Sequence, residues 1–238
     1  VAPLYGTSAL DSAKRSAAHL GIDVTWRSLD EFLTLVERNR TALNVATLVG
    51  LGTTRSAIAG DDERKLDRAE IAAQAAIVRE ACEHGAVGVS SGLIYPPSSY
   101  ADSAELTAMA AAAREARAAV YASHVRNEGD GVIDAVSEAL DIGRRAEVTV
   151  QCSHHKASGK RNWGKVHQTL GMIERARSGG VRAYCDVYPY TASWTELAVI
   201  LPPDVRFGGT QATLARLRDP QSAAAIALSL ELSQNGLW

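Results

Sequence analysis

The chain has 238 residues, and 46% of them are hydrophobic, so it can bury a substantial core and extensive disorder is not expected. Its 25 basic and 27 acidic residues leave a formal net charge of −2. A charge this small gives no electrostatic signature for binding nucleic acid or an anionic membrane surface. No run approaches the roughly 18 to 20 apolar residues of a membrane-spanning helix. We therefore expect a small-molecule partner, no nucleic acid and no membrane; the oligomeric state stays open.

The three cysteines are an odd number and lie far apart, at Cys82, Cys152 and Cys185. Each lies inside an apolar segment, which is typical of reduced, buried thiols in a cytoplasmic protein rather than of a disulfide framework. We therefore expect free, buried cysteines and a cytoplasmic location.

Between residues 43 and 190, short apolar runs alternate with longer segments of helical periodicity. This order predicts an α/β fold in which helices cover a parallel sheet. The predicted strands are residues 43–49, 86–90, 119–124, 147–153 and 182–188. Five such strands could form an open doubly wound sheet or the middle of an eight-stranded barrel, and periodicity alone does not choose between them.

Three helices are predicted to begin with a capping box, in which the first side chain accepts from a free backbone N–H and a glutamate three residues later reaches back. The pairs are Ser28 with Glu31, Asp67 with Glu70, and Asp102 with Glu105. In the second of these helices, Val78 and Cys82 belong to an apolar stripe that should face the sheet, and Gly85 should end the helix.

After residue 190 the alternation stops. Consecutive prolines at 202 and 203 break the chain, and short helical patterns follow at 211–217 and 221–232. We predict a partial barrel over residues 1–200 and a small, truncated helical insertion over residues 201–238.

Three of the six histidines are expected to be structural, because two precede glycines at helix ends and one lies on a predicted surface helix. These are His19, His84 and His167. The other three follow predicted strands, at His124, His154 and His155.

His124 and His154 each end a predicted strand in a Ser-His pair, one βα repeat apart. Parallel strands present their carboxyl ends at one edge of the sheet, where α/β enzymes place their chemistry. Neutral imidazole is a preferred zinc ligand, and a hydrolytic zinc site uses about three protein ligands and a water. The spacing suggests a metal site; two hydrogen-bonded polar residues at a sheet edge remain the alternative.

Strand alternation complicates the choice of the second histidine. Residues 148, 150, 152 and 154 would share one face, and residues 149, 151, 153 and 155 the other. By this criterion alone His155, rather than His154, could point inward.

Other polar residues near the predicted strand ends could serve the same site. Arg126 and Lys156 each stand two residues beyond a strand-end histidine, where they could hold an anion, although isolated charges are more often solvated. Tyr95 lies in a loop stiffened by paired prolines. Tyr188 ends the fifth predicted strand, where its phenol could donate to a developing oxyanion or simply be hydrogen-bonded in the barrel interior.

Several common catalytic motifs are absent from the sequence. It contains no P-loop, no dinucleotide-binding glycine motif after a strand, and no serine-hydrolase elbow around Ser90 and Ser91.

Five segments, taken together and in this order, resemble a known family. They are residues 44–50 (NVATLVG), 88–97 (GVSSGLIYPP), 123–128 (SHVRNE), 153–156 (SHHK) and 186–190 (DVYPY). The sequence resembles the D-aminoacylases, the N-acyl-D-amino-acid deacylase branch of the amidohydrolase superfamily. The resemblance implies a zinc-dependent (β/α)8 TIM-type barrel that hydrolyses the amide of N-acyl-D-amino acids to a carboxylate and a D-amino acid. The readable strands would be about the third to the seventh.

The resemblance also implies roles for individual residues, and it favours His154 over His155. By motif, His124 and His154 match the metal-binding histidines, Lys156 with help from Tyr95 holds the substrate carboxylate, Ile94 lines the side-chain pocket, and Tyr188 polarises the scissile carbonyl. Two alternatives stay open: a cyclic-amide hydrolase similar to dihydropyrimidinase or hydantoinase, and a catalytically inactive remnant.

The sequence departs from the family pattern in several places. The family's His-x-His motif, its cysteine ligand and its proton-shuttling aspartate have no match and would lie outside Val1 to Trp238. Leu51 stands where histidine is usual, and Trp194 where a serine usually contacts substrate. We therefore expect an internal portion of a longer enzyme that is inactive by itself.

Overall fold

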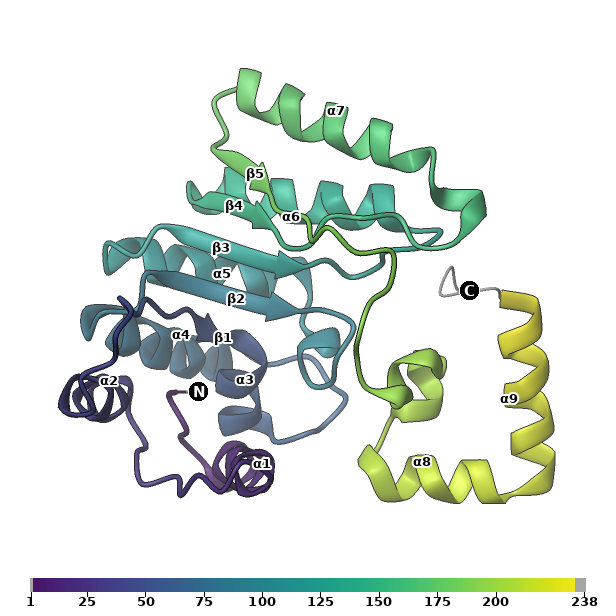
Figure 1. Cartoon of the computed structure of the whole chain (residues 1–238), viewed down its shortest axis with the longest axis horizontal. Helices are drawn as coiled ribbons and strands as arrows, with labels where there is room; N and C mark the ends of the chain where they lie inside the picture. The colour runs from purple at the N-terminus through teal and green to yellow at the C-terminus, as the bar shows by residue number, and fades with distance from the viewer. Residues whose placement is uncertain (1, 234–238) are drawn as a thin grey trace.

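The computed structural model describes residues 2–233 and contains a five-stranded parallel sheet in the order β1-β2-β3-β4-β5 (Figure 1). The strands are β1 (Val49–Gly50), β2 (Gly88–Gly92), β3 (Val120–His124), β4 (Thr149–Cys152) and β5 (Ala183–Cys185). Every strand pairs with its neighbour in sequence, so the order never reverses as it does in a doubly wound sheet. The partial barrel is the alternative that the structure confirms.

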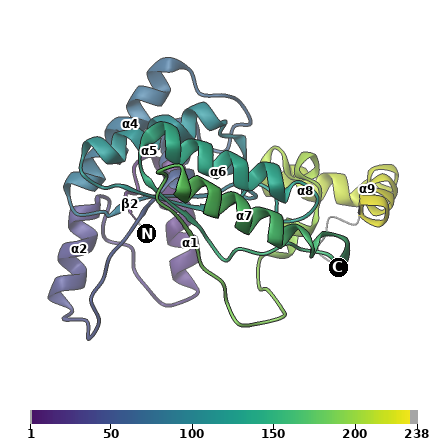
Figure 2. The ribbon, with the colours of Figure 1, turned by 90° about the horizontal axis from the view of Figure 1, so that it is seen from above.

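Helices cover one face of the sheet, and others precede and follow it (Figures 1 and 2). The α-helices are α1 (Thr7–Ala18), α2 (Leu29–Arg38), α3 (Leu51–Ala59), α4 (Arg68–Glu83), α5 (Ser103–Glu115), α6 (Val132–Ala146), α7 (Lys165–Ser178), α8 (Gly209–Arg218) and α9 (Pro220–Ser233). Short 3₁₀ turns occur at η1 (Ser98–Tyr100), η2 (Lys160–Asn162), η3 (Leu197–Ile200) and η4 (Pro203–Arg206).

The core lies between the sheet and helices α4 to α7. Val89, Tyr121 and Val150, on adjacent strands, are in register and fully buried. The neighbouring strand positions Ser90 and Gln151 are only half-buried and belong to the opposite face. This second face is the one that a closed barrel would turn inward.

The two edge strands are shorter than predicted. Within residues 2–233, β1 and β5 each have one neighbouring strand, so fewer of their residues form ladder hydrogen bonds. Before β1, Thr47 accepts a bond from Val87 N–H, but regular pairing begins only at Val49. The chain leaves β5 at Cys185, and Val187 beyond it is exposed.

Two of the three predicted capping boxes are confirmed, at Ser28 and at Asp67. The third is half wrong. Asp102 accepts from the backbone N–H groups of Ala104 and Glu105, but the Glu105 side chain turns inward to Arg55, with Nε to Oε1 at 3.1 Å. A buried guanidinium requires a counter-charge, and this requirement overrides the local cap.

Other local predictions are confirmed. His19 and His84 are the C-terminal caps of α1 and α4, and His167 is exposed on α7. Val78 is fully buried in α4. Gly85, just after the end of this helix, adopts a positive φ of 110°.

The cysteine prediction is partly wrong. All three are free, and Cys82 and Cys152 are buried, but Cys185 is exposed because it lies on edge strand β5. Within residues 2–233, no helix combines the length and apolar character that crossing a membrane requires.

Helices α8 and α9 confirm the two helical patterns that follow the proline break. They lie beyond the carboxyl ends of the strands (Figure 1). Arg206, just before α8, ties this region to the loop after β2, because its Nη1 donates to the Ile94 carbonyl at 2.8 Å. The division into a barrel part and a helical insertion at residue 200 stays a prediction.

Candidate metal centre

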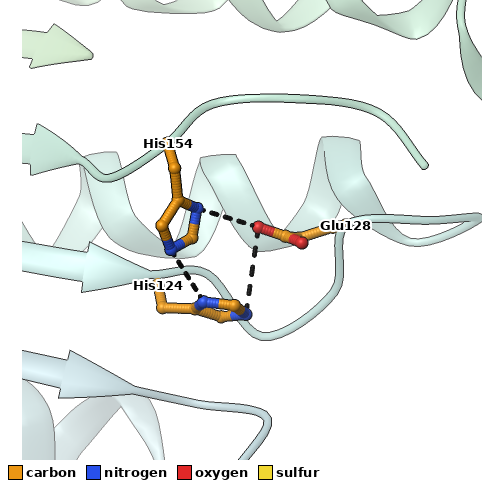
Figure 3. Close-up of side chains that lie close together, drawn as sticks. All are labelled: His124, Glu128 and His154. Carbon is orange, nitrogen blue, oxygen red and sulfur yellow. Dashed lines mark hydrogen bonds and ion pairs between the residues drawn. The ribbon is translucent and has the colours of Figure 1, made fainter. Parts of the chain in front are cut away.

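The ends of β3 and β4 bring His124 and His154 together (Figure 3). Ser123 and Cys152 are register partners, His124 is the last residue of β3, and His154 lies two residues beyond β4. Their rings meet edge-on at an interplanar angle of 71°, with His124 Nδ1 and His154 Nε2 2.9 Å apart. The structure therefore places the two histidines as their spacing in the sequence suggested.

The choice between His154 and His155 depends on a turn. His154 has a φ of 39°, in the left-handed region that residues other than glycine seldom adopt. Side chains alternate between the two faces of a sheet only while the backbone is extended, so alternation no longer predicts which way His154 and His155 point. The His155 ring instead reaches α7, where its Nε2 is 2.9 Å from Thr169 Oγ1. His155 therefore packs behind the sheet edge, and His154 faces His124.

One carboxylate holds this turn. The His154 N–H donates to Asp186 Oδ1 at 2.6 Å, and the His155 N–H donates to the Asp186 carbonyl at 2.7 Å. Asp186 also accepts from the Gln151 side-chain amide at 2.5 Å. The residue after β5 thus stabilises an unfavourable backbone conformation two residues after β4.

Sequence reasoning missed Glu128, in the loop after β3. Its Oε1 lies 3.1 Å from His154 Nδ1 and 3.8 Å from His124 Nε2. One donor atom from each of these three residues lies within 4.8 Å of the others. Its place in the segment SHVRNE, four residues after His124, could have pointed to Glu128. Periodicity could not, because a charged residue in a loop belongs to no repeating pattern of buried positions.

The electrostatics of the group suit a cation. Burial lowers the pKa of His124 to about 4, so the ring is neutral at pH 7, which is the form that binds metals. Burial opposes ionisation of Glu128, but the hydrogen bonds from His154 and Lys156 and the charge of Lys156 leave its pKa below the ordinary value. Among residues 2–233, His124 Nε2 is a buried nitrogen without a hydrogen-bond partner. Two imidazoles beside a carboxylate, with one ring nitrogen left unpaired, suit a zinc ion.

Lys156 lies within this group rather than in solvent. Its Nζ is 2.5 Å from Glu128 Oε1, and 2.9 Å from both the carbonyl oxygen and Nδ1 of His154. An ammonium has three donors, and the Glu128 carboxylate and the His154 carbonyl accept two of them; His154 Nδ1 accepts the third only when it carries no proton.

Arg126, by contrast, anchors the loop after β3. It forms a two-pronged ion pair with Glu138 on α6, with nitrogen to oxygen distances of 2.9 and 3.0 Å. It also donates to the carbonyls of Ser99 and Ala101 at 3.0 and 2.8 Å. These contacts use the guanidinium for structure and leave Lys156 as the cation beside the histidines.

Two tyrosines flank the pair. The ring centroid of Tyr95 lies 5.5 Å from that of His124, and its hydroxyl is 2.8 Å from Thr195 Oγ1. Tyr188 lies 6.4 Å from the His154 ring, and Lys156 Nζ is 5.4 Å from the Tyr188 centroid. Both predicted tyrosines are thus next to the histidines.

A cavity of about 1020 Å³ lies beside Tyr95. Its wall includes the loop after β2, helix α1, residues 196–201 and part of α8. Tyr95 lines this cavity and also packs beside His124, so its ring separates the cavity from that histidine. Ile94, half-buried next to it, is held through its carbonyl by Arg206.

No family model matches the chain, but individual relatives do. It is 40% identical over 196 residues to an N-acyl-D-glutamate deacylase of Alcaligenes xylosoxydans xylosoxydans, covering 82% of this chain and 39% of the relative. An N-acyl-D-aspartate deacylase and a D-aminoacylase of the same organism are 41% and 36% identical over 70% of this chain, and 33% and 34% of their own lengths. The chain belongs to the D-aminoacylase family. It spans about 39% or less of these relatives.

Solved structures of the family agree. The N-acyl-D-glutamate deacylase of Bordetella bronchiseptica, solved with zinc and a phosphonate that mimics the tetrahedral intermediate, matches with a TM-score of 0.67 at 39% identity. The match covers 71% of this chain and 36% of that one. A D-aminoacylase studied for its binuclear metal centre matches with a TM-score of 0.69 at 28% identity, over 85% of this chain and 45% of that one.

Proposed function

We propose that this chain supplies part of the active site of a zinc-dependent hydrolase that cleaves the amide of N-acyl-D-amino acids to a carboxylate and a D-amino acid. The observation that carries the proposal is the approach of His124 Nδ1 and His154 Nε2 to 2.9 Å at the carboxyl edge of the sheet. The family of the chain supports the substrate class, since its relatives are named deacylases of N-acyl-D-glutamate and N-acyl-D-aspartate.

His124 and His154 would hold the zinc. Bound zinc supplies Lewis-acid polarisation of the amide carbonyl and lowers the pKa of water. The protein contributes two imidazoles, of which His124 is neutral and half-buried, and a left-handed turn that aims His154. Burial around His124 limits bulk water, which strengthens electrostatic interactions in the site.

Lys156 would bind the substrate carboxylate, with Tyr95 beside it. The ammonium lies next to the histidines, so a carboxylate bound to it would place the neighbouring amide near them. Ile94 would line the pocket for the substrate side chain, since it directly precedes Tyr95, which lines the cavity. Tyr188, 6.4 Å from the His154 ring, would donate its hydroxyl proton in a hydrogen bond to the scissile carbonyl.

Hydrolysis assays on the protein that carries this chain test the proposal. N-acetyl-D-methionine should be turned over, and a hydantoin or a dihydropyrimidine should not. Turnover of the ring substrates alone would replace the proposal with a cyclic-amide hydrolase. Failure on both kinds of substrate with zinc bound would indicate an inactive relative.

The role of Lys156 has its own test. Lys156→Met should raise KM for N-acyl-D-amino acids by roughly 30-fold or more, because removing one partner of a desolvated charge pair costs at least about 2 kcal/mol. The corresponding substrate amides lack the carboxylate and should change much less. An equal rise in KM for both would reject the role.

A further inference from the structure

The two histidines have an inner and an outer pair of nitrogens (Figure 3). The inner pair, His124 Nδ1 and His154 Nε2, face each other at 2.9 Å. The outer pair, His124 Nε2 and His154 Nδ1, both lie near one oxygen of Glu128, at 3.8 and 3.1 Å. A neutral imidazole has one N–H and one lone pair, so the position of the proton decides which pair can bind a metal.

We propose that Glu128 is a positioning residue, which holds the proton of His154 on its outer nitrogen Nδ1 and so leaves the inner nitrogen Nε2 free to bind zinc beside His124. This inference rests on the proposed function, because it assigns these histidines to the metal. An ionised carboxylate is an acceptor only, so the His154 ring beside it favours the tautomer with the N–H on Nδ1. The lone pair of His154 Nε2 then faces His124 Nδ1 at 2.9 Å, on the side away from Glu128.

Glu128 does not serve as a third metal ligand, because a cation already lies on the outer side. Lys156 Nζ is 2.5 Å from Glu128 Oε1 and 2.9 Å from His154 Nδ1. A zinc ion bound between these atoms would repel the ammonium at close range. The inner side of the pair is therefore the side left for the metal.

Glu128 also determines how many N–H groups of Lys156 are free to bind a substrate carboxylate. Its three acceptors are Glu128 Oε1 and the carbonyl oxygen and Nδ1 of His154. Once His154 Nδ1 carries a proton and donates to Glu128, it no longer accepts from Lys156. One ammonium N–H is then released for the substrate carboxylate, while Glu128 keeps the lysine in place.

Zinc affinity and imidazole tautomers of the protein that carries this chain test the inference. Zinc binding is measured by competition with a chelator for the wild type, Glu128→Ala, Glu128→Gln and His154→Ala. Glu138→Gln is the matched control, because Glu138 is also a half-buried, ion-paired carboxylate but bonds Arg126 on the outside of the loop. Nitrogen-15 NMR of the zinc-loaded wild type identifies the ring nitrogen that binds the metal.

Glu128→Ala should lower zinc affinity by roughly 10- to 100-fold, as the loss of a carboxylate behind a ligating histidine does. Glu128→Gln should recover most of this affinity, since its amide oxygen still accepts from His154 Nδ1–H, and the control should match the wild type. NMR should place zinc on His154 Nε2 and a proton on Nδ1.

Two results would overturn the inference alone: Glu128→Gln losing as much affinity as Glu128→Ala with zinc on His154 Nδ1, or Glu128→Ala binding zinc like the wild type. If His154→Ala also binds zinc like the wild type, the proposed function fails together with it.

Discussion

Strands β3 and β4 both lead into a Ser-His pair, yet the structure supports the two histidines in different ways. His124 is a regular strand residue in register with Gly92, so the backbone ladder sets its position. β4 stops at Cys152, and His154 lies in a left-handed turn held by the Asp186 carboxylate. The same dipeptide thus gives one histidine whose position is set by the sheet and another whose position is set by the Asp186 side chain, just after the next strand.

The loops that follow differ in the same sense. The loop after β3 is tied outward, through Arg126, to Glu138 on α6. The loop after β4 is tied inward, through Lys156, to Glu128. We infer that the β3 side is the fixed half of the site and the β4 side the adjustable half.

The largest expected effect is the loss of a proposed ligand on the adjustable side. His154→Ala should lower zinc affinity by more than about 100-fold and abolish turnover, because it removes a donor and not merely its support. His155→Leu is the matched control, since that ring packs against Thr169. Zinc stoichiometry and turnover are the measurements; loss of zinc in the His155 variant with retention in the His154 variant would reverse the assignment.

Removing the support of the turn should have the next largest effect. Asp186→Ala frees the His154 N–H, so the left-handed backbone relaxes and zinc affinity should fall roughly tenfold. Gln151→Ala removes the other partner of this carboxylate but leaves the turn bonded, and it should change zinc affinity much less. Equal losses in the two variants would show that the turn does not depend on the backbone bond.

A substitution on the β3 side should lower the free energy of unfolding more than it lowers zinc affinity. Arg126→Ala removes the ion pair with Glu138 and the bonds to two carbonyls, and the partly exposed site limits the cost to about 1–2 kcal/mol of unfolding free energy. Urea denaturation measures this cost. A zinc defect larger than that of Asp186→Ala would contradict the division into fixed and adjustable halves.

The smallest effect is expected at the Arg64–Glu70 ion pair, which is remote from both loops. It shows how the stability of the fold depends on pH away from the site. The Arg64 hydrogen bond, with the backbone bond at Asp67, lowers the pKa of Glu70 to about 2 from an ordinary value of 4.5. A carboxyl with a lowered pKa stabilises the fold above the ordinary value, and this stabilisation is lost as the pH falls toward 2. Glu70→Gln should therefore be slightly less stable than the wild type at pH 6, and the gap should close by pH 2. A gap that persists at pH 2 would assign the effect to something other than charge.

The sequence by itself determined the elements and their order. Alternating apolar runs and helical patterns specify parallel βα units because their periods are local properties of the chain. The caps at Ser28 and Asp67 were readable because a capping box spans only four residues. The same local reasoning placed His124 and His154 at strand ends, and the family resemblance selected His154 over His155.

Only the tertiary structure decided how these residues meet. The turn at His154 depends on Asp186, 32 residues later, and Lys156 depends on Glu128, 28 residues earlier. Sequence periodicity cannot predict such pairs, because it reflects only residues close together in the chain. Glu105 shows the same limit, since its local pattern predicted a capping role but burial of Arg55 drew it inward. Buried charges and backbone bonds are satisfied by whichever partner the packed chain brings near, so these choices are made across the fold rather than along the sequence.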